Sequence, residues 1–352
     1  MRIVLFDRIN ETHVCTALED ALRAMGHTVL ATGPLWQGHR FATSNEDIAR
    51  IDAVLEALLD EGCDAFFNFR ASTLNERQLL RLRSAGVASA VWLPDDPVLY
   101  GVTYRSIVDC YDHVLHCGPA NVLQFYADRA HNPGVNFPFW LDPARWSSDW
   151  RIEHVDQDLV FLGNLVGAVR KGRYTQLARV AGNIAIYGRC GDDPHDMHRG
   201  ELYGVDAIRA VMPRFAAGLN IPQCFADYAG TEYDFDGLAA LGGFDLPSRV
   251  TQYAAMGVPV ISLGRNAASS HFPWALQADD VIAALAVAKR LRSSPAFATE
   301  ISEHARTAVV EHFSAAARAQ FLVALFEGEV RPRELDMHER EYAYLSFTGA
   351  VD

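Results

Sequence analysis

The feature that most constrains the fold is an alternation between short apolar runs and segments of helical periodicity, which starts at the first residue. Such alternation is typical of parallel sheets whose strands are joined by crossover helices. In the N-terminal half, the pattern predicts strands over 2–6, 27–31, 65–69, 88–93 and 113–116, and helices over 13–25, 45–59 and 75–85.

The sequence predicts a second domain of the same kind. Residues 132–143 are rich in turn formers and aromatic residues and break both periodicities, so we predict a linker there. Beyond it, the alternation predicts strands over 158–162, 184–187 and 216–219, and helices over 169–180, 205–212, 278–293 and 295–328. With half of 352 residues apolar, the chain can fill two cores. We therefore predict an α/β protein with an N-terminal domain over 1–143 and a C-terminal domain over 144–328.

The composition excludes several classes of protein. A net charge of −13 argues against a nucleic-acid partner, which would need a basic surface. Six cysteines without CxxC pairs favour a reduced compartment and no structural zinc. The sequence has no apolar window of about 18 residues and opens directly into a strand, so we expect a cytoplasmic protein with no integral membrane segment. The preference for arginine over lysine resembles a bacterial coding bias.

The segment LPSRVTQYAAMGVPVIS, residues 246–262, carries the strongest functional signal. We expect Ser248 to cap a helix that ends at Gly257 in a left-handed conformation and leads into a buried strand. Arg249 and Gln252 lie in the first turn, beside the free N–H groups where a diphosphate or ribose would sit. The alternative is that this unit is an ordinary helix-to-strand connection of an α/β fold without a ligand role.

A second candidate for phosphate binding is VFLGNLVGAVRKGRY. Gly163 and Asn164 follow a predicted strand, and Gly163 allows a close approach of the backbone to a ligand. Arg170 and Arg173, in preference to Lys171, could neutralise a departing diphosphate. The segment matches neither the Rossmann nor the Walker glycine pattern, and a solvated basic turn is the alternative.

In the first domain, polar residues follow predicted strands. Asp95 and Asp96, in PDDP, could orient an acceptor hydroxyl or act as a base, although either could be a turn aspartate. His13, at the start of the first helix, suits proton transfer, and a helix start explains it equally well. Asn68 and Arg70 could bind polar groups of a substrate.

The predicted loop over 221–245 has no clear period and is long for a compact domain, so it is a candidate lid. It contains Asp234 and Asp236, a DxD pattern that can hold a divalent metal. Short acidic patterns are common by chance, and we expect a solvated loop and no metal site.

Two doubly wound domains place a ligand between facing sheets. Glycosyltransferases of the GT-B type, sugar-nucleotide 2-epimerases and solute-binding proteins use this plan, and the last would need an export signal.

Taken in order, VWLPDDP, YDHVLHCGPANVLQFY, GVNFPFWLDPARW, DLVFLGN, IAIYGR, FAAGLNIP and LPSRVTQYAAMGVPVIS resemble GT-B glycosyltransferases, most closely the CgeB-like family near the retaining group-1 enzymes.

The resemblance implies a GT-B fold of two Rossmann-like domains and a glycosyltransferase of hexosyltransferase type. The C-terminal domain would bind a nucleoside diphosphate sugar, the N-terminal domain would bind a hydroxyl-bearing acceptor (a small molecule, glycan or protein), and 329–352 would return to the N-terminal domain. No cofactor or metal is expected.

The chain departs from the resembled family at one position. Gln252 stands where such enzymes usually have a ribose-binding glutamate, and a neutral amide loses about 1 kcal/mol of charge-assisted hydrogen bonding. A sugar-nucleotide epimerase or hydrolase, or a catalytically silent nucleotide-sugar-binding protein, is the alternative.

Overall fold

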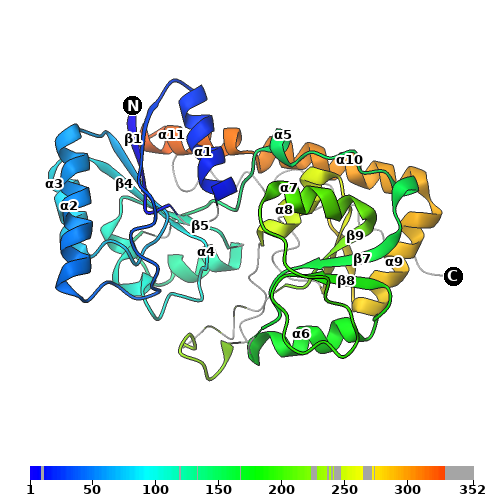
Figure 1. Cartoon of the computed structure of the whole chain (residues 1–352). Coiled ribbons are helices and arrows are strands. Elements are labelled where there is room, and N and C mark those ends of the chain that lie inside the picture. The colour runs from blue at the N-terminus through cyan, green and yellow to red at the C-terminus, as the bar shows by residue number, and fades with distance from the viewer. Residues whose placement is uncertain are drawn as a thin grey trace.

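The computed structural model describes residues 1–8, 12–118, 120–132, 134–166, 168–222, 228–235, 238, 241, 247–264, 272 and 274–329. Figure 1 shows two lobes, each built around a sheet with helices on its faces. Among the described residues, both sheets contain only parallel strand pairs. The α/β prediction with two doubly wound domains is therefore confirmed.

The N-terminal sheet has the strand order β2-β1-β3-β4-β5-β6. Its strands are β1 (Arg2–Phe6), β2 (Thr28–Ala31), β3 (Ala65–Asn68), β4 (Ala88–Leu93), β5 (His113–His116) and β6 (Val135–Asn136). Its helices are α1 (Thr12–Ala24), α2 (Asn45–Glu61), α3 (Glu76–Ser84) and α4 (Ala120–Ala127). Strand β6 lies inside the predicted linker, where two residues are too short for a periodic signal.

Alternate residues of these strands enter two cores, as strand geometry requires. Val4 and Phe6 pack with α2 and α3 on one face of the sheet, whereas Ile3 and Leu5 pack with α1 on the other. The second face is completed by α11 (Ala315–Phe326), which comes from the far end of the chain and lies against α1 (Figure 1).

The C-terminal sheet has the order β11-β10-β9-β7-β8. Its strands are β7 (Gln157–Leu162), β8 (Ile184–Tyr187), β9 (Phe215–Asn220), β10 (Val260–Leu263) and β11 (Leu276–Ala278). The helices of this part are α5 (Pro143–Trp146), α6 (Ala168–Ala178), α7 (Val205–Val211), α8 (Ser248–Met256), α9 (Val281–Ser293) and α10 (Pro295–His312).

Two details differ from the sequence expectation. The predicted helix over 295–328 is two helices, because the chain leaves α10 at Phe313 and Ser314 caps α11 by accepting from the Ala317 N–H. Ser314 also forms a parallel β-bridge with Leu141 of the predicted linker. The two segments that connect the domains therefore lie side by side at this point. The return to the N-terminal domain is made by α11, earlier than the predicted 329–352, of which residues 330–352 lie outside the described residues.

Candidate functional site

The first part of the site is the turn after β7. The Gly163 N–H donates to the Tyr187 carbonyl at 2.8 Å, and the Asn164 side-chain oxygen accepts from the Arg189 N–H at 2.9 Å. Gly188 allows this approach: its φ is +127°, and a Cβ there would lie 2.5 Å from the Gly163 carbonyl oxygen. The carboxyl ends of β7 and β8 therefore form one tight double turn that holds Gly163 and Asn164.

Helix α8 is fixed to this turn by a buried tyrosine. The Tyr253 hydroxyl oxygen accepts the Leu162 N–H at 2.8 Å, and burial raises the pKa of Tyr253 well above its ordinary value. The Tyr253 ring lies against Gly218 of β9, where a Cβ would be 2.4 Å from the ring. Helix α8 is thus seated against both β7 and β9.

The prediction that Ser248 caps α8 is wrong. Pro247 occupies the N-cap position with extended backbone (φ −71°, ψ 142°), and its carbonyl accepts the Val250 N–H. Within the part of the chain that the structure describes, no side chain caps the helix. The fixed φ of proline suits this position but provides no side-chain acceptor. Ser248 is the first helical residue, in the turn whose N–H groups suit an anion.

Arg249 is brought to the turn after β7. Its guanidinium carbon lies 5.3 Å from the centre of the Phe161 ring, and its Nη1 is 3.7 Å from where a Cβ of Gly163 would be. Gly163, Asn164 and Arg249 therefore lie together at the carboxyl edge of the sheet. The predicted left-handed end of α8 at Gly257 is confirmed, with φ +78°.

Gln252 does not lie on an open face, contrary to the sequence expectation. Every residue from Val250 to Met256 is buried because α10 and the sheet pack around α8, and only 6% of Gln252 is exposed. Arg173 is also 6% exposed, on α6. Arg170 lies in the first turn of α6, and its side chain, like that of Lys171, is outside the described residues.

A buried polar pair on the adjacent strands β9 and β10 was not predicted from the sequence. The Asn220 amide, at the end of β9, donates to the Ser262 hydroxyl of β10 at 3.0 Å, and both residues are buried. Polar residues at the ends of two adjacent parallel strands are the signal that could have found it.

Asp7, at the carboxyl edge of the N-terminal sheet, was not predicted from the sequence either. It follows β1 with φ +51°, and its carboxylate accepts from the Leu35 N–H at 2.5 Å and from the Thr73 hydroxyl. The Arg70 Nε lies 3.8 Å from this carboxylate. Asp7 thus ties the loops after β2 and β3 together and holds Arg70 at the carboxyl edge.

The two aspartates after β4 have different surroundings. Asp95 is exposed, whereas the Asp96 side chain has no exposed atom. The Asp96 carboxylate accepts from His116 Nδ1 and from the Tyr126 hydroxyl, each at 2.5 Å. Burial raises the pKa of Tyr126, and the Asp96 carboxylate raises it further, so this phenol stays protonated and donates. A direct contact between Asp96 and an acceptor does not fit this geometry, because both oxygens bond within the protein.

Asn68 is fully buried as well. Its amide donates to the Tyr111 hydroxyl at 2.7 Å, and its oxygen accepts the Arg70 N–H at 3.1 Å. Asn68 therefore shapes the turn that carries Arg70, and direct contact between Asn68 and an acceptor does not fit. His13 is the second residue of α1, and its side chain is outside the described residues.

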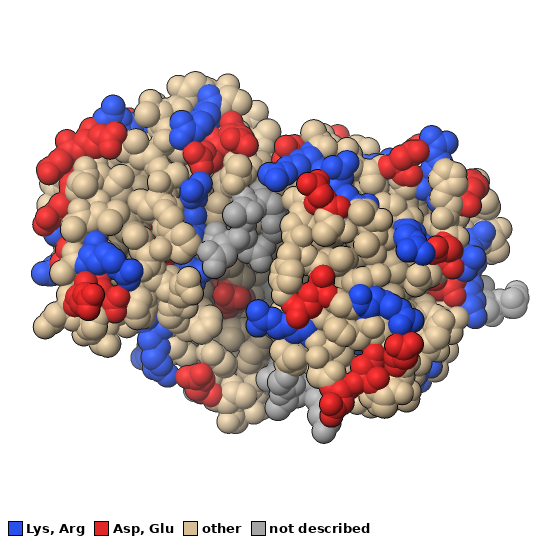
Figure 2. All heavy atoms as spheres, in the orientation of Figure 1, with Lys and Arg blue, Asp and Glu red and all other residues tan. Residues whose placement is uncertain are grey.

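Within the predicted lid over 221–245, Ile221 packs in the C-terminal core. The residues that pack in or against the N-terminal core are Tyr228, Tyr233, Phe235, Leu238 and Leu241, although the chain on either side belongs to β9 and α8. Contacts of Asn121 with Leu241 and of Tyr100 with Phe235 join this part of the chain to the N-terminal lobe, and Figure 2 shows a groove between the two lobes. Asp234 accepts the Gly230 N–H within its own turn, and Asp236 is outside the described residues.

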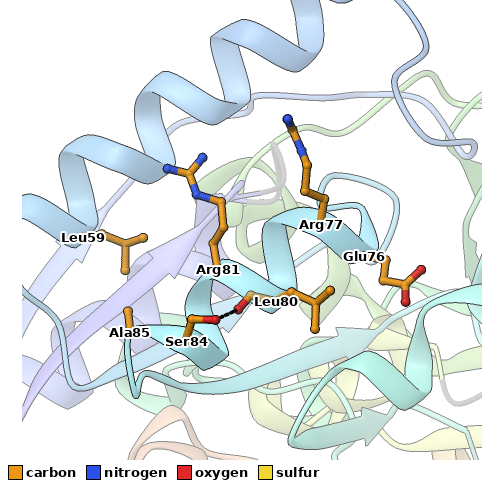
Figure 3. A pocket seen from close by; sticks show the side chains of 7 residues that line it. All are labelled: Leu59, Glu76, Arg77, Leu80, Arg81, Ser84 and Ala85. Carbon is orange, nitrogen blue, oxygen red and sulfur yellow. Dashed lines mark hydrogen bonds between the residues drawn. The ribbon is translucent and has the colours of Figure 1, made fainter.

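A separate depression of about 670 Å³ lies on the outer face of α3, beside the end of α2, where Leu80 and Arg81 reach the surface (Figure 3). It lies on the helical face of the N-terminal sheet, away from the carboxyl edge. Among the described residues, no cluster of His, Cys, Asp or Glu could hold a metal ion, and no helix is long and apolar enough to cross a membrane.

Comparison with known proteins agrees with this architecture. Residues 164–324 match the family model described as Glycosyl transferase-like. No curated protein sequence matches the chain significantly.

Among solved structures, the chain is similar to an α,α-trehalose-phosphate synthase (UDP-forming) from Burkholderia vietnamiensis, at 11% identity and TM-score 0.62, over 93% of this chain and 99% of that one. It is similar to HepE from Anabaena in complex with UDP, at 10% identity and TM-score 0.59, over 93% and 100%. It is also similar to T4 phage BGT in complex with UDP-glucose, at 11% and 0.53, over 93% and 99%. The fold is GT-B, and residues 164–324 of the chain are similar to a glycosyl transferase-like family.

Proposed function

We propose that this protein is a glycosyltransferase that moves a sugar from a nucleoside diphosphate sugar to a hydroxyl-bearing acceptor without a metal ion. The observation that carries the proposal is that Gly163, Asn164 and Arg249 lie together at the start of α8. A helix start with a nearby guanidinium suits the two negative charges of a diphosphate. Two of the similar structures are described as complexes with UDP or UDP-glucose, which supports a donor of this class.

In this proposal, the donor occupies the C-terminal side of the groove. Arg249 and the first turn of α8, with Ser248, hold the diphosphate, and Arg170 or Arg173 on α6 neutralises the charge that develops as it leaves. Asp95 and His13 act on the acceptor hydroxyl, with Arg70 as a further acceptor contact. Asn68 and Asp96 do not contact the acceptor directly in this proposal. Asn68 fixes the turn that carries Arg70, and Asp96 is bonded to His116 and Tyr126.

The finer family assignment, to the CgeB-like group near the retaining group-1 enzymes, belongs to the proposal, as does a cytoplasmic location. A catalytically silent nucleotide-sugar-binding protein is the second candidate. It is favoured by Gln252, a buried neutral amide in place of a glutamate that would make charge-assisted bonds to ribose hydroxyls.

The proposal is tested by ligand binding and then by turnover. UDP, GDP, TDP and ADP are each added at millimolar concentration. At least one of them should raise the melting temperature, because a ligand that binds only the folded state stabilises that state. The corresponding nucleoside diphosphate sugar should then be consumed only when an acceptor is present, and turnover should survive EDTA. If none of the four nucleotides raises the melting temperature, the donor site is contradicted. Binding without turnover favours the catalytically silent protein. Activity that is lost in EDTA and restored by Mn²⁺ contradicts the metal-free mechanism.

A further inference from the structure

The segment between β9 and α8 belongs to one domain by sequence and to the other by packing. We call residues 228–235, 238 and 241 of this segment the bridging segment. Leu238 is fully buried in the N-terminal core, and Tyr228, Tyr233, Phe235 and Leu241 pack partly buried against the same core. A segment that only covered the groove would not need to bury apolar side chains in the opposite domain.

Phe235 makes the central contact. Its ring centre lies 5.4 Å from that of Tyr100 and 5.6 Å from that of Phe125, both in the N-terminal domain. Gly101 makes room for it, since a Cβ at residue 101 would lie 3.3 Å from the Cβ of Phe235. Aromatic rings at these separations attract beyond their buried area.

Two polar contacts also join the bridging segment to the N-terminal domain. The Asn121 amide donates to the Leu241 carbonyl at 2.6 Å, and Arg40 pairs with Glu232 at 3.2 Å. Phe235 packs on Tyr100, which lies five residues after Asp95 in the loop that follows β4. The bridging segment therefore reaches the edge where the acceptor is proposed to bind.

Both ends of the bridging segment return to donor-side elements. It leaves β9 after Asn220 and re-enters at Pro247, the N-cap of α8. Because the bridging segment is covalently part of the chain between β9 and α8, its packing on the N-terminal core ties the C-terminal domain to the N-terminal domain. We propose that the bridging segment is a strap that sets the position of α8 relative to the acceptor domain, with Phe235 as its positioning residue. The proposal rests on the proposed function, because it assigns the donor to α8.

The seat of α8 in its own domain does not involve the strap. Tyr253 is bonded to Leu162 and packed on Gly218, both within the C-terminal domain. Loss of the strap should therefore leave nucleotide affinity nearly unchanged and misalign the donor with the acceptor. A misplacement of about 1 Å can cost about 10²-fold in rate.

The first experiment tests docking in solution without any activity. Gly101→Cys with Phe235→Cys places two Cβ atoms close to the separation of about 3.5–4.5 Å that a disulfide spans. Under a mild thiol oxidant, the full-length double variant should form an internal cross-link, detected by peptide mass mapping and reversed by dithiothreitol. Each single variant is the control for the other cysteines. Absence of the cross-link overturns the strap, whether or not the protein transfers sugar.

The second experiment tests positioning. Phe235→Ala should lower kcat by about 10- to 100-fold, while the dissociation constant of the nucleoside diphosphate found by thermal shift stays within about twofold. Phe235→Leu, which keeps an apolar side chain, should recover most of the rate. Glu232→Ala is the matched control in the same segment, since a pair this exposed contributes little.

A kcat of Phe235→Ala within about twofold of the parent overturns the positioning role, and so does a parallel loss of nucleotide affinity. If Phe235→Ala does not fold, Gly101→Val displaces the ring from the other side, and the same split between kcat and affinity is required. A cross-link in a protein that transfers no sugar supports docking and places the failure in the proposed function.

Discussion

Replacing Gly188 with alanine is expected to damage the donor site without touching any proposed ligand contact. Gly188 has φ +127°, a conformation that L residues rarely adopt, and an added Cβ would lie 2.5 Å from the carbonyl oxygen and 2.8 Å from the carbonyl carbon of Gly163. Both are backbone atoms of the double turn, which no side-chain rotation can move aside.

The size of the effect follows from two costs. A non-glycine residue held in a disfavoured region costs about 1–3 kcal/mol, and forcing an extra carbon into a packed site costs about 1–3 kcal/mol. The free energy of unfolding should therefore fall by about 2–6 kcal/mol. For a domain of this size, each kcal/mol lowers the melting temperature by about 2–4 °C, so we expect a fall of at least about 4 °C.

The functional consequence is measured by nucleotide titration. If Gly163 and Asn164 hold the donor, their displacement should weaken nucleoside diphosphate binding by about tenfold or more, equivalent to about 1.4 kcal/mol. Gly191→Ala, three residues further along, is the matched control, because a Cβ there would meet nothing within 4 Å. Gly191→Ala should change neither the melting temperature nor the affinity for the nucleoside diphosphate.

Two results would refute this reasoning. A Gly188→Ala protein that melts within about 1 °C of the parent contradicts the packing argument. A protein that melts earlier but binds nucleoside diphosphate as the parent does contradicts the assignment of the turn to the donor.

Three further predictions follow from named side chains. Arg173→Ala, or Arg170→Ala, should lower kcat by about 10²–10³ with a smaller loss of donor affinity; Arg173→Met, which keeps much of the buried volume, should fail to restore kcat, and restoration would show that volume and not charge matters. Gln252→Glu buries a carboxylate at a 6% exposed position, so it should lower the melting temperature of the free enzyme yet bind nucleoside diphosphate equally or more tightly, and weaker binding would contradict a ribose contact. Burial lowers the pKa of His113 below 6.5, against an opposing effect of Asp112, so the unfolded chain binds more protons between the two pKa values. Stability should therefore rise with pH up to about 6.5 and level off above it, and His113→Gln should reduce that slope in melting curves from about pH 5 to 8; an unchanged slope would exclude His113 as its source.

Local pattern was sufficient for most elements. The ranges of β1, β4, β5 and β8 match the predicted strands because their apolar residues are contiguous in sequence. Strand β11 was not predicted because a run of three residues, which overlaps the predicted helix over 278–293 only at Ala278, is too short for a periodic signal. The break before α11 was missed inside 295–328 because one serine cap is a weak signal within a long helical pattern.

The candidate site was predictable only in part. Gly163, Arg249 and Asp95 were predicted because each stands near the end of a strand or the start of a helix, where ligands of α/β folds bind. The structure confirms these positions, and their roles stay predictions. Sequence could not tell Asp95 from Asp96, since the exposure of one and the burial of the other depend on His116 and Tyr126, 20 and 30 residues away from Asp96.

The sequence by itself determined that the protein has two parallel α/β domains, because the period of apolar residues is a local property that each segment carries alone. Only the tertiary structure decided which polar residues are left for a ligand. It buried Asn68, Asp96 and Gln252, and it seated the bridging segment on the opposite domain. Burial of a side chain depends on partners distant in sequence, and that information is absent from any single stretch of the chain.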